Sequence, residues 1–506
     1  MASTPTPPRA WAGLVVLLLP ALLTSMDISI LFVAGPAISH DLAPSAGQWL
    51  WMMDIYSFVL AGLLITMGDL GDRIGRRRLL LLGAVLFGVG SAGLTFAPSP
   101  EWFIAGRALL GVGAATLAPS TLALIRTMFA GEDHRRAAVG AWTVAFSGGA
   151  VAGPIVGGLL LEHFWWGSVF LVNVPVMALL VVTVPYLVPE SRAETTASFD
   201  GAGAVLSLVG IIALVNGGKL VPEQGAAPSA LLSLVLGVVF LVWFVVRQRR
   251  AANPLLDLSL FRQPAFGVAV ASNLVVSVVM AGLGLLAFTF LQTVHGMEPL
   301  RAALVALPTF AGTFLGAAAA SAAATRLRPH VLVVGGFLVS ATGMATIGVV
   351  GPDTPVPVFI AGYTTLTFGI GCVSTLASSL VLDHAPPERA GSAASVSETG
   401  ITLGDALGIA LFGTVSAAVY RGLMAREDVG AGSEAQETVV GALAHAWSLP
   451  PEQGSVLLRA AFESFTSGMT TVALAASALL AVTAVLVGTV LGRRPSTRPA
   501  VSGPRR

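Results

Sequence analysis

Long apolar stretches separated by short polar segments recur along the whole chain. Each has about 20 residues or more, the length that a helix needs to cross a hydrocarbon layer of ~30 Å. Within lipid, every backbone N–H and C=O must find its partner inside the segment, so the pattern predicts helices rather than strands. Fourteen spans are predicted, at residues 11–36, 47–67, 79–97, 101–128, 135–161, 168–188, 201–218, 229–247, 265–293, 300–322, 331–350, 355–383, 391–421 and 461–491.

The composition agrees with this pattern. Of the 506 residues, 55% are hydrophobic and only 10% are charged, which is too little polar surface to cover a water-soluble protein. No basic tract with interleaved aromatic residues is present, so we expect no nucleic-acid partner. The single cysteine, Cys372, lies in an apolar stretch and is expected to be a core residue. The sequence therefore predicts an all-α membrane protein that resides in a lipid bilayer.

The polar segments differ in charge between the two sides of the predicted membrane. If the N-terminus is cytoplasmic, the inner loops have about three times as many Lys and Arg residues as the outer loops, where we place Lys219. This bias predicts a multi-pass protein with both termini in the cytoplasm. The first apolar stretch lacks a small-residue cleavage site and is expected to be retained. Arginine replaces lysine almost everywhere, which indicates a GC-rich bacterial genome and hence the bacterial cytoplasmic (inner) membrane.

Two charge-rich stretches, 189–200 and 247–264, flank two predicted helices that contain almost no ionisable group. We interpret these helices as a pair inserted between two six-helix bundles. The predicted domains are an N-terminal bundle at 1–195, the inserted pair at 196–250, and a C-terminal bundle at 251–506 with one long outer loop at 422–460.

The segment between the second and third predicted helices is rich in glycine and arginine. It reads Gly68-Asp69-Leu70-Gly71-Asp72-Arg73-Ile74-Gly75-Arg76-Arg77-Arg78. Glycines allow a sharp turn, and Asp72 can pair with neighbouring guanidiniums or with a facing helix N-terminus. A simple cytoplasmic anchor would need only the arginines. The full spacing resembles the signature loop of the major facilitator superfamily, which implies a relay or gating role for Gly68, Asp72, Arg73, Gly75 and Arg76.

A second glycine-rich pattern, at residues 148–158, lies in the fifth predicted helix. Small residues let helices pack closely, and an internal proline bends a helix. The pattern is similar to the motif of the antiporter branch of this superfamily, here formed by Gly153, Pro154, Gly157 and Gly158.

Together, the two motifs and the fourteen spans resemble the drug:proton antiporters of that branch. Residues 48–57 and 395–399 are most similar to quaternary-ammonium and dye efflux pumps. The resemblance implies the major facilitator fold, with two six-helix bundles and two extra central helices.

Four acidic residues lie inside predicted spans, where lipid opposes a charge. A carboxyl group in a cavity that water can reach is able to exchange a proton for a cation. We predict proton-coupling or cation-binding roles for these residues, with a structural hydrogen bond or ion pair as the alternative. They are Asp27, Asp54, Glu398 and Asp405.

Arg107 is a basic residue inside the fourth predicted span. A buried charge needs a partner or contact with water, and Glu101 is a candidate partner near the outer edge. We predict a relay or gating role for Arg107, with a purely structural pair as the alternative.

On the second predicted helix, Trp51, Asp54 and Phe58 share one face. We predict that the two aromatic residues line a substrate cavity, where a flat lipophilic cation could stack. An aromatic stripe alone would equally suit a lipid-facing or core position.

The sequence gives no sign of enzymatic chemistry. The only lysine, Lys219, is followed by Leu220, so the phosphate-binding Gly-x-x-x-x-Gly-Lys-Ser/Thr loop is absent. The histidines show no metal-ligand spacing. We therefore expect no enzyme, no metal, no cofactor and no use of ATP.

The predicted function is a proton-driven antiporter that exports hydrophobic, mostly cationic drugs, biocides and dyes by alternating access. Its expected partners are small lipophilic cations, protons and lipid, and we expect a monomer. One alternative is a dedicated exporter of one metabolite or antibiotic on the same fold. A second is a membrane receptor or scaffold that transports nothing, which would leave four intramembrane carboxyl groups without a purpose.

Overall fold

The computed structural model describes residues 8–129, 131–192, 200–224, 227–250, 259–383, 390–426 and 433–492. Within these ranges the chain is almost entirely helical and contains no strand. Thirteen helices of the described part are long and apolar enough to cross a membrane, and α2 raises the number to 14 if its two parts, bent by 55°, form one span. The predicted all-α membrane fold is thus confirmed.

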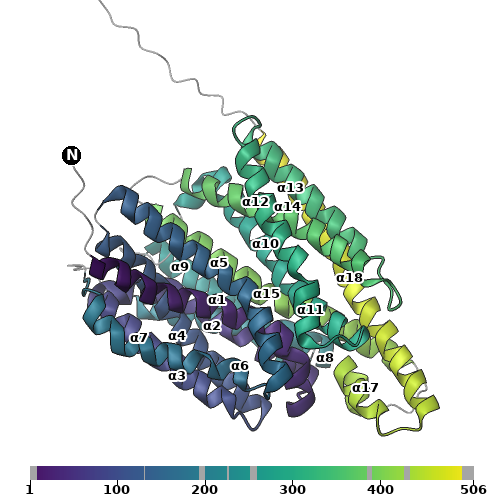
Figure 1. The fold of residues 1–506 in the computed structure, drawn as a ribbon. Helices are drawn as coiled ribbons and strands as arrows, with labels where there is room; N and C mark the ends of the chain where they lie inside the picture. Colours follow the sequence, from purple (N-terminus) through teal and green to yellow (C-terminus); the bar gives the residue numbers. More distant parts are fainter. Residues whose placement is uncertain are drawn as a thin grey trace, which may run out of the picture.

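The helices follow one another in three groups along the chain (Figure 1). The N-terminal half consists of α1 (Pro8–Leu42), α2 (Ala46–Ile74), α3 (Arg76–Thr95), α4 (Pro100–Met128), α5 (Glu132–His163), α6 (Ser168–Leu171) and α7 (Asn173–Leu187). The inserted pair is α8 (Gly201–Gln224) and α9 (Pro228–Arg250). The C-terminal half consists of η1 (Leu260–Arg262), α10 (Pro264–Thr289), η2 (Phe290–Val294), α11 (Pro299–Val305), α12 (Leu307–Ala323), α13 (Pro329–Ile347), α14 (Val356–Asp383), α15 (Ala390–Met424), α16 (Ser433–Glu437), α17 (Val439–Ala446) and α18 (Pro451–Leu491).

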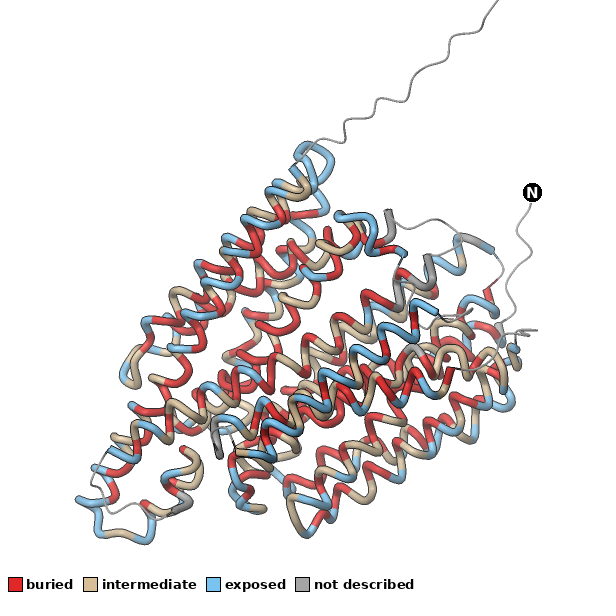
Figure 2. Tube along the Cα trace, turned by 180° about the vertical axis from the view of Figure 1, so that it is seen from behind, coloured by how far each residue is buried: buried red, intermediate tan, exposed pale blue. Residues whose placement is uncertain are grey.

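The two halves repeat the same packing arrangement. In the N-terminal half α1 packs along α5 and α4 packs against both α2 and α3, while in the C-terminal half α10 packs along α15 and α14 packs against both α12 and α13. Each half also encloses a large buried apolar cluster. Buried residues follow the faces that the helices turn toward one another (Figure 2). Such an internal repeat is typical of secondary transporters, whose cargo sites lie between the repeats.

The inserted pair does not stand apart from the two halves. Helix α8 packs against α9, and it also contacts α2 of the N-terminal half and α15 of the C-terminal half. A small buried cluster joins the three helices through Phe58 of α2, Val215 of α8, and Ala406 and Ala410 of α15. Helix α8 therefore lies where both halves can act on it. The predicted domain boundaries near 195 and 250 border residues 193–199 and 251–258, which lie outside the described residues.

The two halves approach each other closely at one end of the helical bundle. We call the end with residues 68–78 the motif end and the opposite end, with α16 and α17, the α17 end. Near the α17 end, a Cβ atom on Gly158 of α5 would lie 2.6 Å from the Cα of Leu300 in α11. There, too, the backbone N–H of Ala46 donates to Glu437 Oε2 at 3.4 Å. The two halves are thus in close contact at the α17 end.

The structure differs from the predicted layout in two details. Much of the predicted outer loop 422–460 is helical, because α15 runs to Met424, α16 and α17 follow, and α18 begins at Pro451. Hydropathy finds only the part of a helix that lies in lipid, so it missed the polar first turns of α18. Likewise α8 continues beyond its apolar stretch to Gln224, so Lys219 is in a helix and not in a loop.

Candidate functional site

Asp27 of α1 and Arg107 of α4 form an ion pair in the N-terminal half. Arg107 Nη1 lies 2.5 Å from Asp27 Oδ2, and the side chains of Arg107 and Asp27 are 1% and 0% exposed. The guanidinium also lies over the ring of Tyr56 in α2, 4.6 Å from its centroid. An opposite charge and a π face offset the cost of burying Arg107. Three helices thus meet at one buried cation.

Glu101, which we considered as a partner of Arg107, does not pair with it. Its carboxylate instead accepts a hydrogen bond from Gln48 Nε2 of α2 at 2.5 Å. Residues six apart on an α-helix point in widely different directions, because the helix has about 3.6 residues per turn. Glu101 and Arg107 therefore cannot share a face of α4.

The Asp27–Arg107 pair does not use all of its hydrogen-bonding capacity. Asp27 Oδ1, Arg107 Nε and Tyr56 Oη are buried and have no hydrogen-bond partner among the described residues. Buried polar atoms normally find a partner. All three atoms belong to residues of one buried cluster, so a water molecule or a polar group of a cargo molecule could supply the missing hydrogen bonds.

A second buried ion pair joins the N-terminal half to the inserted pair. Lys219 Nζ of α8 lies 2.7 Å from Asp54 Oδ2 and 3.0 Å from Oδ1, with side-chain exposures of 3% and 0%. The ammonium also lies over the ring of Trp51, 3.9 Å from its centroid. Sequence reasoning missed this pair because it assigned Lys219 to a loop. The one signal was a single lysine directly after an apolar stretch in a chain that otherwise uses arginine.

The predicted aromatic face of α2 is present, but other parts of the chain already contact both of its rings. The rings of Trp51 and Phe58 are 6.3 Å apart in an edge-to-face arrangement. Phe58 is fully buried against α8 and α15, and Lys219 lies over Trp51. In this structure, the chain's own ammonium thus occupies the position that we predicted for a cargo cation.

The two acidic residues of α15 are less enclosed than those of the N-terminal half. Glu398 is exposed and Asp405 is half-buried, and no ion pair joins either carboxylate to another described residue. Together with Thr402 they fall at i, i+4 and i+7, on one face of the helix. The four predicted acids thus separate into two that form buried ion pairs and two that could exchange a proton without breaking an ion pair.

The glycine- and arginine-rich segment consists of the end of α2, a tight turn at Gly75 and the start of α3. Gly75 has φ +110°, a conformation that side chains rarely tolerate. Asp72 pairs with Arg76 at 2.7 Å and Asp69 with Arg73 at 3.2 Å. Both acids thus bind guanidiniums of their own turn.

Glu190, which follows α7, fixes this turn to the rest of the N-terminal half. Its Oε1 accepts the backbone N–H of Arg77 at 2.9 Å, and the neighbouring Ser191 carbonyl accepts the N–H of Arg76 at 2.8 Å. Sequence reasoning did not single out Glu190. Its position in the charge-rich stretch 189–200 was the available signal.

The glycine motif of α5 lies against the helix that bears Asp27. A Cβ atom on Gly153 would lie 2.8 Å from the Met26 carbonyl oxygen, and one on Gly157 would lie 2.6 Å from Ile30 Cγ1. Gly158 reaches Leu300 of the C-terminal half, and Pro154 lies inside α5 between these contacts. The motif therefore sets the distance between α1 and α5 at the level of Asp27.

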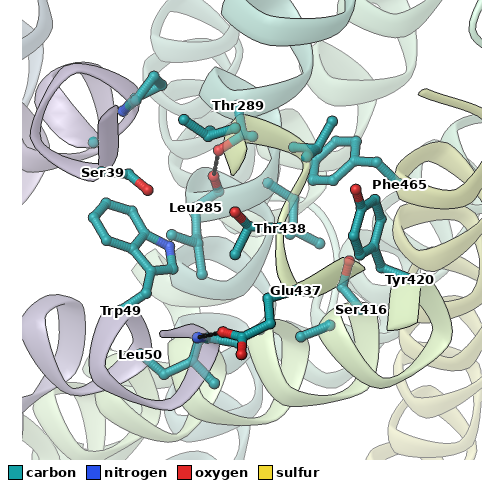
Figure 3. Close-up of a pocket in the computed structure, with 18 residues that line it drawn as sticks. Ser39, Trp49, Leu50, Leu285, Thr289, Ser416, Tyr420, Glu437, Thr438 and Phe465 are labelled. Carbon is teal, nitrogen blue, oxygen red and sulfur yellow. Dashed lines mark hydrogen bonds between the residues drawn. The ribbon is translucent and has the colours of Figure 1, made fainter. Parts of the chain in front are cut away.

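A pocket opens between the halves at the α17 end (Figure 3). Its empty space, including the part open to solvent, is about 660 Å³. Trp49 lies on one side and Tyr420 and Phe465 on the other, with Glu437 between them (Figure 3). Helix α17 contributes Val439 and Val440 to the wall. The pocket is thus mainly apolar with one carboxylate, a lining that suits a lipophilic cation.

Comparison with known proteins places these features in context. Residues 17–409 match the family described as the Major Facilitator Superfamily. The fold is similar to the crystal structure of a bacterial homolog of the human lysosomal transporter Spinster, with a TM-score of 0.70 and 17% identity over 97% of this chain and 100% of that chain.

Several sequence relatives are resistance or efflux proteins. The multidrug efflux pump LfrA of Mycolicibacterium smegmatis is 40% identical over 97% of this chain and 98% of that protein. The methyl viologen resistance protein SmvA of Salmonella typhimurium is 34% identical over 90% of this chain and 93% of that protein. The puromycin resistance protein pur8 of Streptomyces alboniger is 34% identical over 81% and 82%.

Proposed function

Because the chain belongs to the major facilitator superfamily, we propose that it is a proton-coupled antiporter that exports hydrophobic, mostly cationic compounds by alternating access. Members of this family are transporters and not enzymes, and the relatives are multidrug and antibiotic efflux proteins. We further propose that the protein resides in a bacterial cytoplasmic membrane with both termini in the cytoplasm, as the arginine-rich loops favour.

The observation that supports proton coupling best is the state of the α15 acids. Glu398 is exposed and Asp405 is half-buried, and each lacks an ion-pair partner among the described residues. A carboxyl group of this kind can be protonated from one side of the membrane and deprotonated on the other. The exchange needs no other charge to move, which makes α15 the best candidate for the proton step.

Cationic cargo is supported by the geometry around Asp54. A buried carboxylate next to an indole ring already holds one ammonium, that of Lys219. Organic cations bind to the same combination of a negative charge and an aromatic face. A relative named for resistance to methyl viologen, a flat aromatic dication, points to the same class of compound.

In the proposed cycle, inward opening separates the halves at the motif end and outward opening separates them at the α17 end. The segment at residues 68–78 would govern the first event, as its resemblance to the signature loop of the family implies. The pocket near Trp49 and Tyr420 would receive cargo before release.

Transport in inside-out membrane vesicles tests the proposal. An acidic vesicle interior should drive ethidium uptake, and a protonophore should abolish that uptake, because the proton gradient is the only energy source in the scheme. Vesicles that contain the Glu398→Gln variant at equal protein level should show background uptake. Ethidium uptake that persists at full rate after the gradient collapses would contradict the proposal.

A second candidate function is the export of one dedicated metabolite or antibiotic, which a relative named for puromycin resistance favours. Competition in the same vesicles separates the two functions. Unrelated dyes and biocides should compete with ethidium for a multidrug site, whereas a dedicated exporter would ignore most of them.

A further inference from the structure

The only lysine of the chain is buried at a point where three groups of helices meet. Lys219 belongs to α8, its partner Asp54 belongs to α2, and α8 also packs against α15 through Val215, Ala406 and Ala410. The ammonium contacts both carboxylate oxygens, at 2.7 and 3.0 Å, and the Trp51 ring at 3.9 Å. The inserted pair thus places a cation against α2, about one helical turn from the contact of α8 with α15.

The surroundings of this ammonium have the chemistry of a receptor for organic cations. Asp54 supplies a negative charge, Trp51 an aromatic face, and Phe58 an apolar wall next to it. All three belong to α2, so they would form this cation site whether or not α8 lay against them. Helix α8 contributes the occupant, Lys219, and packs Val215 against Phe58.

Lys219 also has a way out of the site. It lies five residues before the end of α8 at Gln224, a rise of about 7–8 Å at 1.5 Å per residue. A lysine stem covers most of such a distance and can bring its ammonium toward the polar layer. The adjacent Gly218 is exposed and has no atom within 4 Å of where a Cβ would lie, so the face of α8 next to that of the lysine is uncovered.

We propose that Lys219 is a tethered cation that fills the Asp54–Trp51 site until an organic cation displaces it. Without a cation, Asp54 would be a buried unpaired charge, which is strongly unfavourable. The lysine keeps the site neutral when no cargo is bound, and cargo releases it toward the end of α8. Helix α8 contacts α15 next to Asp405. The release of Lys219 therefore couples cargo binding to α15, the helix that carries Glu398 and Asp405. The inference rests on the proposed function, since it needs a cationic cargo.

Chemical labelling of the intact protein tests the displacement directly. As Lys219 is the only lysine, an amine-reactive reagent modifies one side chain, and mass spectrometry of the peptide around residue 219 measures it. Saturating ethidium should increase the labelling rate of Lys219 severalfold. Unchanged or slower labelling in the presence of bound ethidium would overturn the proposal, because a simple structural pair stays closed and an occluded site becomes less reactive.

Binding to purified variants provides an independent readout. Lys219→Gln removes the competitor, so the Kd for ethidium should fall about tenfold. A decrease of this size is expected if only a minor fraction of wild-type molecules has the site free of Lys219. Lys219→Arg, which retains the charge, should return the Kd toward the wild-type value. Asp54→Asn combined with Lys219→Gln should bind weakly, because the negative charge is gone.

The same variants separate a tethered cation from a structural pair. Lys219→Gln should be less stable than the double variant, because it leaves Asp54 unpaired, and ethidium should raise its unfolding temperature more than that of the double variant; an equal effect of ethidium on both variants would overturn the proposal. Ethidium export by the wild type with unchanged Lys219 labelling would overturn only this inference. If the wild type neither exports nor binds ethidium, the proposed function and this inference are both overturned.

Discussion

Arg107 donates to Asp27 across a distance of 2.5 Å, and almost no solvent reaches either side chain. The two residues belong to α4 and α1 and lie 80 positions apart in the sequence. A buried ion pair of this kind contributes most when it is broken, because the remaining partner is then a buried unpaired charge.

Asp27→Asn should therefore lower the stability of the protein by about 3–5 kcal/mol. Thermal unfolding of the purified protein in detergent measures the loss. The double variant Asp27→Asn, Arg107→Gln should recover much of the stability, since it has no unpaired charge, but not the transport activity. Equal unfolding temperatures for wild type and Asp27→Asn would show that water already solvates this pair.

Glu398→Gln should behave in the opposite way. No described ion pair depends on Glu398 and its side chain is exposed, so the unfolding temperature should stay close to that of the wild type. Proton-driven export should nevertheless be lost. A variant with normal stability and normal ethidium efflux would remove Glu398 from the proton step and leave Asp405 as the candidate on α15.

Gly149→Ala should destabilise the packing of α1 on α5, whereas Gly148→Ala should not. A Cβ on Gly149 would overlap the Leu22 carbonyl oxygen, but a Cβ on Gly148 meets no atom within 4 Å. Overpacking of this kind typically costs about 1–3 kcal/mol. Unfolding temperatures of the two adjacent variants, measured side by side, check the prediction. A similarly small decrease in unfolding temperature for both variants would mean that α1 can move away from α5.

Gly75→Ala should strain the turn at the motif end. Its φ of +110° is unfavourable for alanine, and a Cβ there would lie 2.7 Å from the Glu190 carboxylate. We expect a loss of about 1–2 kcal/mol for the backbone conformation alone. Gly68→Ala, where a Cβ has free space, is the matched stability control. An unfolding temperature for Gly75→Ala equal to that of the control would argue that the turn relaxes.

Asp200, just before α8, should make the inserted pair sensitive to acid. Burial opposes its charge, but hydrogen bonds from Gly203, Arg247 and Gln248 outweigh burial and lower the pKa of Asp200 below its usual value. A lowered pKa stabilises the fold at neutral pH, and the contribution disappears as pH falls below about 4. Asp200→Asn should therefore unfold at a lower temperature than wild type at pH 7, and the difference should narrow in acid. A difference independent of pH would contradict this assignment.

Much of the helical layout was predictable because a membrane imposes a simple rule. Apolar stretches of a fixed length must become helices, and the predicted spans agree with the helices except at their ends. The buried position of Arg107 was also predictable, since nothing else explains a charge inside an apolar stretch. Hydropathy failed where a helix leaves the lipid, as in the first turns of α18.

The partners of the buried charges were not predictable. Asp54 and Lys219 are 165 residues apart, and the periodicity of one helix gives a face but not the helix that lies against it. Lys219 was assigned to a loop because hydropathy treats every lysine at the end of an apolar stretch as an end signal. Only the packing of α8 on α2 shows that this lysine turns inward.

The position of α8 has a consequence for attempts to shorten the chain. Excision of residues 200–250 would leave twelve spans, the number in two six-helix halves, and would look harmless on a hydropathy plot. It would also remove Lys219, the counter-charge of Asp54 in α2, and expose Phe58. A twelve-helix version of this protein would therefore need other side chains at positions 54 and 58 before it could fold.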